Sequence, residues 1–159
     1  RIKALVWHVV IYFEAVDLPE LWDFFTALPT TVVVDHMGRP DVSKPVDGPE
    51  FALFLKFMRD HENVWSKVSC PERLSVAGPK ALNGEQAAYR DVVPFARKVV
   101  ETFPDRVLWG TDWPHPNLKD HMPDDGLLVD FIPHIAPTAE LQKKLLVTNP
   151  MRLYWPEEH

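Results

Sequence analysis

A carboxylate stands at the end of the most strand-like segment of the chain, where it could act as a base. Val107, Leu108 and Trp109 form a short apolar run without helical spacing, which is typical of a strand buried on both faces. Gly110 and the prolines beyond it stop the strand, and Asp112 follows directly. Parallel α/β folds place their chemistry at the carboxyl ends of strands. This pattern favours Asp112 as a catalytic residue, although a turn-forming aspartate explains the segment alone equally well.

Three further predicted strands also end in side chains that can do chemistry. Tyr12 closes the first strand, His36 follows the second, and Arg73 follows the third through a turn that begins at Cys70. In repeated parallel strand–helix units all strand ends lie at the same rim. We therefore expect Tyr12, His36, Arg73 and Asp112 to converge, and this convergence is the functional signal.

Taken singly, these residues have simpler interpretations. Tyr12 suits core packing with a bonded hydroxyl, His36 could satisfy backbone groups in a turn, and an isolated arginine is most often a solvated surface residue. Cys70 reads as a small buried side chain, because no adjacent histidine or helix start is evident that would lower its thiol pKa. His115 follows Asp112 closely enough to line the same mouth, whereas a structural role is expected for the other histidines.

The elements that must position these side chains alternate along the chain. Apolar runs without helical spacing predict four strands, at residues 5–13, 31–34, 64–70 and 107–109. Helical spacing predicts helices at residues 17–28, 48–61, 85–102, 127–135, 138–147 and 149–154. We expect Asp17 and Glu20 to form a capping box, Pro94 to kink the third helix, and Asn149 to cap the last. The order predicts an α/β fold with a parallel sheet.

Composition excludes several classes of protein. The 159 residues suffice for one domain, and 46% hydrophobic with 25% charged residues is an ordinary globular composition. A net charge of −6 without a cluster of basic residues argues against a nucleic-acid partner, although a few arginines could still hold an anionic small molecule. No apolar run approaches the roughly 18 residues of a membrane span. A single cysteine rules out an internal disulfide and favours the cytoplasm.

Three segments resemble the amidohydrolase superfamily. They are VVVDHMGRPD at residues 32–41, WGTDWPHPN at 109–117 and TNPMRLYW at 148–155. More narrowly, they resemble the amidohydrolase 2 branch that contains 2-pyrone-4,6-dicarboxylate lactonase, and the resemblance covers essentially the whole chain. It implies a (β/α)8 TIM-type barrel with its active site at the carboxyl rim. It also implies hydrolysis of a lactone ring in the degradation of aromatic, lignin-derived compounds.

The resemblance also implies roles for individual residues. Asp112 would deprotonate the attacking water, His36 would help to polarise the ring carbonyl, Tyr12 would contact the substrate, and Arg73 would pair with a substrate carboxylate. These roles suit the reaction, which needs a base for water, donors for the developing oxyanion, and guanidinium groups for a dicarboxylate. Weaker candidates for the same pocket are Arg39 and Asn117.

The chain departs from the family pattern in one respect. Such barrels carry a His-x-His pair at the end of the first strand, and none occurs here. Only four strands are predicted, whereas a complete barrel needs about 250 residues. We therefore expect residues 1–159 to form the carboxyl-terminal half of one barrel domain. The amino-terminal half would be the missing partner, and a homo-oligomer is also possible.

Two alternatives follow from the same residues. Members close to the lactonase work without a divalent metal, so we expect no metal cofactor. The alternative is a zinc- or manganese-dependent decarboxylase or hydrolase with His36 and Asp112 as ligands. A rival of another class is a non-catalytic half-barrel that binds a partner or self-associates through its exposed sheet edges.

Overall fold

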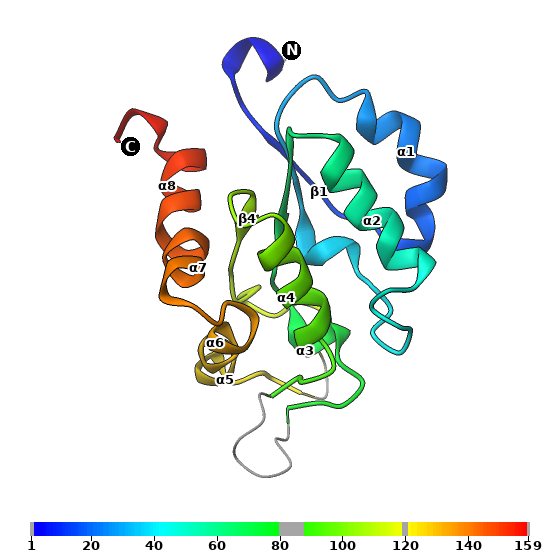
Figure 1. Cartoon of the computed structure of the whole chain (residues 1–159), viewed down its shortest axis with the longest axis vertical. Helices are drawn as coiled ribbons and strands as arrows, with labels where there is room; N and C mark the ends of the chain where they lie inside the picture. Colours follow the sequence, from blue (N-terminus) through cyan, green and yellow to red (C-terminus); the bar gives the residue numbers. More distant parts are fainter. Residues whose placement is uncertain (1, 80–87, 119–120, 159) are drawn as a thin grey trace.

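The computed structural model describes residues 2–79, 88–118 and 121–158, and these residues contain a four-stranded parallel sheet (Figure 1). The strands lie across the sheet in chain order: β1 (Val9–Ile11), β2 (Val32–Val34), β3 (Val64–Lys67) and β4 (Val107–Leu108). The register pairs Val32 with both Val9 and Val64, and Ser66 with Val107. The predicted parallel α/β fold is confirmed.

Helices follow each strand and cover the sheet. The α-helices are α1 (Leu18–Thr26), α2 (Pro49–Asp60), α3 (Pro71–Leu74), α4 (Val93–Thr102), α5 (Asp125–Asp130), α6 (Ile132–Ile135), α7 (Ala139–Lys143) and α8 (Asn149–Tyr154). Shorter turns are η1 (Ile2–Leu5), η2 (Ala15–Asp17), η3 (Asp35–Gly38), the π-helical η4 (Lys144–Thr148) and η5 (Pro156–Glu158). Figure 1 shows α1, α2 and α4 on one side of the sheet, whereas α7 and α8 lie beside β4. None of the helices in the described ranges combines the length and apolar character that crossing a bilayer requires.

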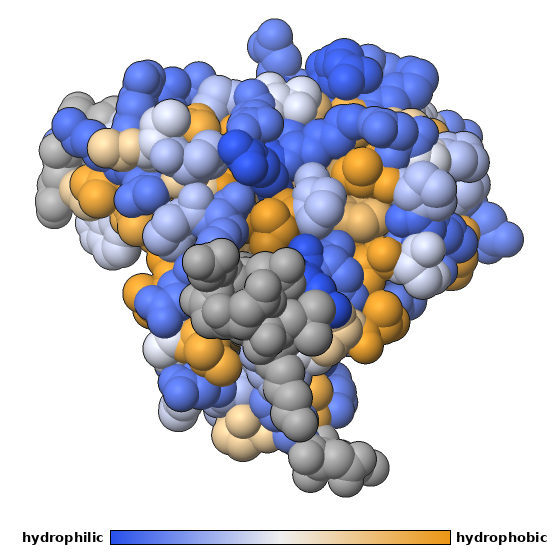
Figure 2. Space-filling view, turned by 60° about the horizontal axis from the view of Figure 1, so that its bottom comes forward, coloured by the Kyte–Doolittle hydropathy of each residue, from blue (hydrophilic) through white to orange (hydrophobic). Residues whose placement is uncertain are grey.

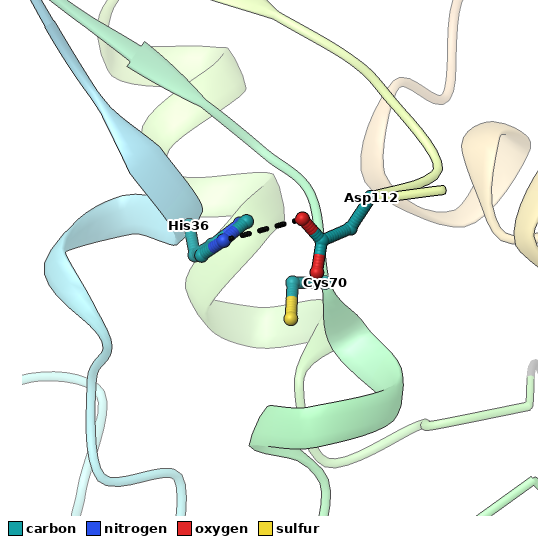
Figure 3. Close-up of side chains that lie close together, drawn as sticks. All are labelled: His36, Cys70 and Asp112. Carbon is teal, nitrogen blue, oxygen red and sulfur yellow. Dashed lines mark ion pairs between the residues drawn. The ribbon is translucent and has the colours of Figure 1, made fainter. Parts of the chain in front are cut away.

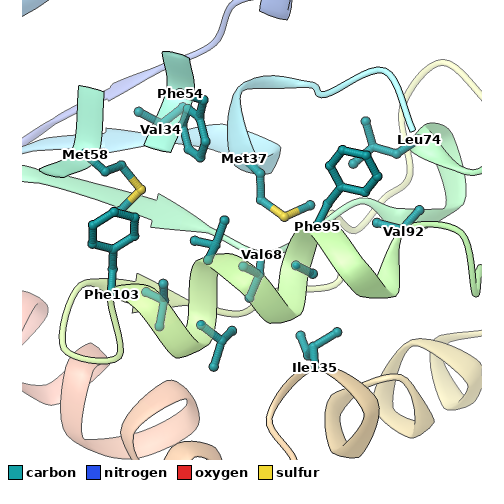
Figure 4. Packing of buried hydrophobic residues seen from close by; sticks show 14 of the residues in the cluster. Val34, Met37, Phe54, Met58, Val68, Leu74, Val92, Phe95, Phe103 and Ile135 are labelled. Atoms are coloured by element: carbon teal, nitrogen blue, oxygen red, sulfur yellow. The ribbon is translucent and has the colours of Figure 1, made fainter. Parts of the chain in front are cut away.

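The main core fills the space between the sheet and its covering helices. Every second strand residue faces these helices, and Val32, Val34, Val64 and Val107 are almost completely buried. Figure 4 shows Val34 in this core together with aromatic and methionine side chains from α2, α4 and the adjoining turns. Each such side chain contributes about 1.5–3 kcal/mol through burial. The covered face therefore holds the strands in the register that determines where each one ends.

The opposite face of the sheet is much less covered. Val33, Trp65 and Leu108 form a small separate cluster there, against which Leu153 packs. Val10 on this face is 47% exposed. β1 and β4 each pair on one side only within the described sheet. A sheet with one packed face and one partly open face is what half of a barrel presents.

The first predicted strand is much shorter than residues 5–13. Leu5 belongs to η1 and is 56% exposed, and only Val9–Ile11 pairs with β2. The apolar run itself suggested burial on both sides. Burial is incomplete because β1 has one neighbouring strand and its other face is open, which the sequence pattern alone does not reveal.

The third predicted strand and the helix that follows it also differ in their bounds. β3 ends at Lys67 rather than at residue 70, because the chain turns sharply at Cys70, where φ is +64°, and continues into the unpredicted α3. Pro94 does not kink a helix: it lies in the first turn of α4, where proline is favoured, and α4 starts at Val93. Residues 85–87 of the predicted helix lie outside the described residues.

Two predicted caps do not form. Asp17 already belongs to η2 and has near-helical backbone angles, so its side chain makes no capping hydrogen bond. Asn149 follows the helical residue Thr148 and is fully buried, with its amide turned to other backbone groups. The predicted helix at 127–135 is divided into α5 and α6, with Phe131 between them. Local patterns located these helices but not the details of their ends.

The side chain of Arg106 joins elements at the amino end of the sheet. Arg106, directly before β4, donates from Nη1 to the carbonyl oxygens of Met58, His61 and Val64, at 2.9, 3.0 and 2.7 Å. This one guanidinium therefore ties the end of α2 to the start of β3. Burial lowers the pKa of Arg106. Because these groups lie far along the strands from Asp112, their role is structural.

Replacement of Asn149 by alanine should destabilise the fold without altering the carboxyl end of the sheet. The Asn149 amide donates to the Pro104 and Val107 carbonyl oxygens at 2.9 and 2.8 Å, so Asn149→Ala removes one partly buried and one buried hydrogen bond. We expect the free energy of unfolding, measured by urea denaturation of the intact protein, to fall by about 2 kcal/mol. Asn63→Ala, which removes one bond to the Thr30 carbonyl, should cost about half as much. Equal, negligible losses would contradict this role.

Candidate functional site

Three residues that follow neighbouring strands point toward one another at the carboxyl end of the sheet (Figure 3). His36 follows β2, Cys70 follows β3 and Asp112 follows β4, and one polar atom of each lies within 4.8 Å of the others. All three have left-handed backbones, with φ of +53°, +64° and +63°. Such conformations cost about 1–3 kcal/mol each and gather at functional sites. The sharp turns aim the side chains across the strand ends.

Arg73 lies in the middle of this group. Its Nη2 is 3.1 Å from Asp112 Oδ2 and 3.0 Å from His36 Nε2, and its Nε donates to Cys70 Sγ at 2.7 Å. The side chains of Arg73 and Asp112 are only 11% and 17% exposed. The predicted convergence of His36, Arg73 and Asp112 is therefore observed. These three residues and Cys70 are called the strand-end cluster below.

His36 is a buried, neutral imidazole in this arrangement. Burial lowers its pKa, and the nearby Asp112 carboxylate only partly offsets that effect. The ring Nδ1 lies 2.8 Å from the Ser69 hydroxyl. Because the guanidinium of Arg73 can only donate, the hydrogen-bond network assigns the lone pair to Nε2 and the proton to Nδ1, which donates to Ser69. Sequence reasoning missed Ser69, whose one signal is its place beside Cys70 at the end of the predicted third strand.

Cys70 is a buried thiol rather than a reactive one. It is fully buried, and burial raises its pKa to about 12. The expected small buried side chain is thus observed. The expectation that no histidine lies near it is wrong, because the fold brings His36 to the same cluster from a different strand. At neutral pH the thiol stays protonated, and it is a poor nucleophile in that form.

Tyr12 and Arg39 meet at a second acidic residue beside the cluster. The Tyr12 hydroxyl donates to the Glu14 carboxylate, and Arg39 Nε donates to Glu14 Oε2 at 3.4 Å. The hydrogen bond from Tyr12 lowers the pKa of Glu14. The Tyr12 ring centroid is 6.2 Å from that of His36. Glu14 was not predicted, because no strand or turn signal distinguishes it from other exposed glutamates.

A cavity of about 250 Å³ adjoins the strand-end cluster. Arg73 belongs to both, and Arg39 lines the cavity with a buried Nη1 that has no hydrogen-bond partner among the described residues. Other polar residues around it are Glu14, Asp41, Lys44 and Glu50. Figure 2, with the lower end of the molecule turned forward, shows hydrophobic patches separated by hydrophilic residues. The two arginines give this cavity the donors that a carboxylate requires.

Two residues of the Asp112 loop do not join the cluster. Asn117 is exposed and, within the described part of the chain, has no hydrogen bond or ion pair with His36, Arg73 or Asp112. His115, which was expected to line the mouth if it had a role, is buried. Its ring lies instead between the acidic side chains of Glu72 and Asp125.

Comparison with known proteins shows which family the chain resembles. The amidohydrolase family matches residues 1–155. A 2-pyrone-4,6-dicarboxylate hydrolase from Comamonas testosteroni is 90% identical over 158 residues, which make up 99% of this chain and 52% of that protein. A 4-sulfomuconolactone hydrolase from Hydrogenophaga intermedia is 37% identical over 94% of this chain and 47% of its own length.

A solved structure shares the fold. The crystal structure of an Agrobacterium tumefaciens protein superposes with a TM-score of 0.78 at 29% identity, over 97% of this chain and 52% of that one. The chain thus spans about half the length of the relatives it matches. This agrees with the expectation, drawn from the four strands and the absent His-x-His pair, of half a barrel.

The prediction of no metal cofactor is contradicted by a solved structure of the same fold. An amidohydrolase from Burkholderia multivorans, with a TM-score of 0.74 and 18% identity over 96% of this chain and 54% of its own, contains bound zinc. In the present chain His36, Cys70 and Asp112 offer three donor atoms. However, the Arg73 guanidinium contacts all three donors and would repel a cation, and the Cys70 thiol is protonated. As arranged here, these residues do not fit a metal ion.

The chemistry of Cys70 can be tested by alkylation. Because burial raises the thiol pKa to about 12, we expect the intact folded protein to react with iodoacetamide at pH 8.5 far more slowly than a free cysteine, whose pKa is about 8.5. Urea-unfolded protein should react at the ordinary rate, which serves as the control. Rapid alkylation of the folded protein, followed by mass spectrometry, would show that the thiol is accessible and ionised.

Proposed function

Because this chain belongs to the amidohydrolase family, we propose that it supplies the carboxyl-terminal half of a barrel that hydrolyses the lactone ring of 2-pyrone-4,6-dicarboxylate. The observation that carries this proposal is the contact of Asp112, Arg73 and His36 at the ends of three neighbouring strands. The 90% identical relative is a hydrolase of this lactone, which supports the choice of substrate. The reaction fits the cytoplasmic breakdown of aromatic compounds.

Asp112 serves as the base in this proposal. Its carboxylate takes a proton from water while the water oxygen bonds to the lactone carbonyl carbon. When the tetrahedral intermediate collapses, the ring carbon–oxygen bond breaks, and the proton passes from Asp112 to the departing enolate oxygen. One water is consumed and an open-chain acid is formed. Asp112 suits this role because its backbone turn and Arg73 hold it at the strand ends.

Arg73 and Arg39 account for the recognition of an anionic substrate. Arg73 Nη2 contacts Asp112, so a carboxylate bound by the rest of this guanidinium would bring the lactone next to the base. Arg39 has a buried, unpartnered Nη1 in the adjoining cavity, where it can hold a second carboxylate. The Tyr12 hydroxyl, bonded to Glu14 in the free protein, would contact the substrate from β1. The spacing of guanidinium groups would thus select a dicarboxylate over a neutral lactone.

His36 polarises the substrate carbonyl once a substrate carboxylate has bound to Arg73. In the free protein its Nε2 accepts from Arg73, so it has no proton to donate there. The Ser69 hydroxyl can either accept from or donate to Nδ1. When a substrate carboxylate turns Nη2 away from His36 while the guanidinium stays beside Asp112, Ser69 can donate to Nδ1, and the tautomer with a proton on Nε2 can bond the carbonyl oxygen. Ser69 therefore allows His36 to change from acceptor to donor.

The remaining half of the barrel would complete the site. The open face at Val10 and the one-sided pairing of β1 and β4 suit four further parallel strands. We propose that the amino-terminal half of the same domain provides these strands together with further carboxylate-binding and histidine residues. A second copy of this chain is the alternative occupant of the two edges. Tests of activity are therefore made on the intact barrel.

Asp112→Asn should abolish catalysis while preserving the fold. Asparagine keeps the size of the side chain and an oxygen for Arg73 but cannot accept a proton from water. We expect kcat for 2-pyrone-4,6-dicarboxylate, followed by loss of pyrone absorbance, to fall roughly 100- to 10,000-fold. The circular dichroism spectrum and melting temperature should change little.

The same assay tests the substrate. Faster turnover of 4-sulfomuconolactone, the substrate named for the 37% identical relative, would keep lactone hydrolysis but replace the dicarboxylate. Turnover of neither compound by the intact wild-type barrel would contradict the proposal and favour a non-catalytic role.

Arg73→Lys should weaken substrate binding more than it slows the bound complex. Lysine keeps the positive charge beside Asp112 but loses the planar fork that holds a carboxylate by two bonds. We expect KM to rise about 10-fold, equivalent to one lost charge-assisted hydrogen bond, with a smaller change in kcat. Arg59→Lys, on the exposed side of α2, is the matched control. An unchanged KM for Arg73→Lys would refute the carboxylate role.

A further inference from the structure

The buried imidazole of His115 connects the Asp112 turn to two acidic side chains. The His115 backbone N–H donates to the Asp112 carbonyl oxygen at 2.7 Å. His115 is 4% exposed. Its ring Nδ1 lies 3.4 Å from Glu72 Oε1, and its Nε2 lies 3.2 Å from Asp125 Oδ1. The Glu72 side chain is fully buried, whereas that of Asp125 is 54% exposed. The Glu72 contact is therefore the one shielded from water.

Glu72 places this contact directly behind the strand-end cluster. It precedes Arg73 on the short helix α3, so the element that carries the guanidinium also carries the partner of His115. The Asp112 turn is thus joined to α3 twice, in front through Arg73 and Asp112 and behind through Glu72 and His115. Asp112 and His115 both have left-handed backbones, with φ of +63° and +59°. A turn of this kind needs such support to hold one conformation.

The burial of Glu72 also requires an explanation. Burial raises the pKa of its carboxyl, which the His115 contact only partly opposes, and its Oε2 has no hydrogen-bond partner among the described residues. An apolar side chain would fill the same space without this cost. A buried carboxyl beside a ring nitrogen does, however, set the orientation of an imidazole, as such pairs do behind metal-bound histidines. The buried Glu72 carboxyl is therefore explained if the orientation of the His115 ring is important for the site.

We infer that His115 is a positioning residue, which through Glu72 holds the Asp112 carboxylate in register with the Arg73 guanidinium. The inference rests on the proposed function, since it assigns to His115 the task of keeping the base aligned. His115 touches neither water nor substrate in this assignment. It acts through the backbone of Asp112 and through α3, so its loss should reduce kcat more than it raises KM.

Two substitutions separate the contacts of the ring. His115→Asn places an amide nitrogen where Nδ1 lies and can keep the hydrogen bond to Glu72, whereas His115→Gln places one near Nε2 and can keep only the contact with Asp125. In the intact barrel we expect kcat of His115→Asn to stay close to that of the wild type. For His115→Gln, kcat should fall at least about 10-fold at nearly constant KM, because a small displacement of a catalytic group is costly. His134→Gln, on α6, is the matched histidine control.

Coupling to Glu72 provides a second readout. If the two side chains act as one unit, Glu72→Leu should lower kcat like His115→Gln, and the double variant should lose little more than either. Fully additive losses, or an Asn variant as impaired as the Gln variant, would overturn the inference. The inference would also be overturned if the decrease in kcat disappeared when only variants with the same melting temperature were compared, because the decrease would then reflect lost stability.

Hydrogen exchange separates this inference from the proposed function. Exchange in the peptide covering residues 109–118, measured by mass spectrometry, should quicken in His115→Gln but not in His115→Asn, because the turn bonded to the His115 amide loosens. This result is expected whether or not the wild type opens the lactone. Unchanged exchange would overturn the positioning role, and an inactive wild type with the expected exchange pattern would refute only the proposed function.

Discussion

Parallel pairing in a single register is the constraint on which the site depends. Four short strands, held by a core on one face, bring residues 36, 70 and 112 to the same edge although β1 to β4 are separated by whole helices. Left-handed turns at His36, Cys70 and Asp112 then redirect each side chain inward. The strained turns persist because the hydrophobic packing behind them holds the backbone in this conformation and offsets its energetic cost.

Arg73 determines the electrostatics of the cluster. Its one guanidinium balances the Asp112 carboxylate, occupies the lone pair of His36 and contacts the thiol of Cys70. A cation that bound these three donors would have to lie at the same position, which the guanidinium already fills.

Local patterns predicted the strand ends but not the contacts behind them. His36, Arg73 and Asp112 could be expected together, because each follows an apolar run and parallel strands end at one rim. Ser69 and Glu72 could not, because their partners, His36 and His115, are distant in sequence and no periodicity links them. Helix ends failed for a related reason: Asn149 resembles a cap, yet burial against β4 offered its amide better acceptors. Roles of the individual site residues remain predictions.

The two ends of the sheet differ in what they can tolerate. Arg106 and Asn149 fasten the amino end through ordinary hydrogen bonds to carbonyl oxygens, and no group of the strand-end cluster touches them. Thermostabilising changes can therefore be sought around these anchors with little trade-off in catalysis. Evolution of new substrate preferences, by contrast, must work among turn residues whose backbone angles exclude most β-branched replacements.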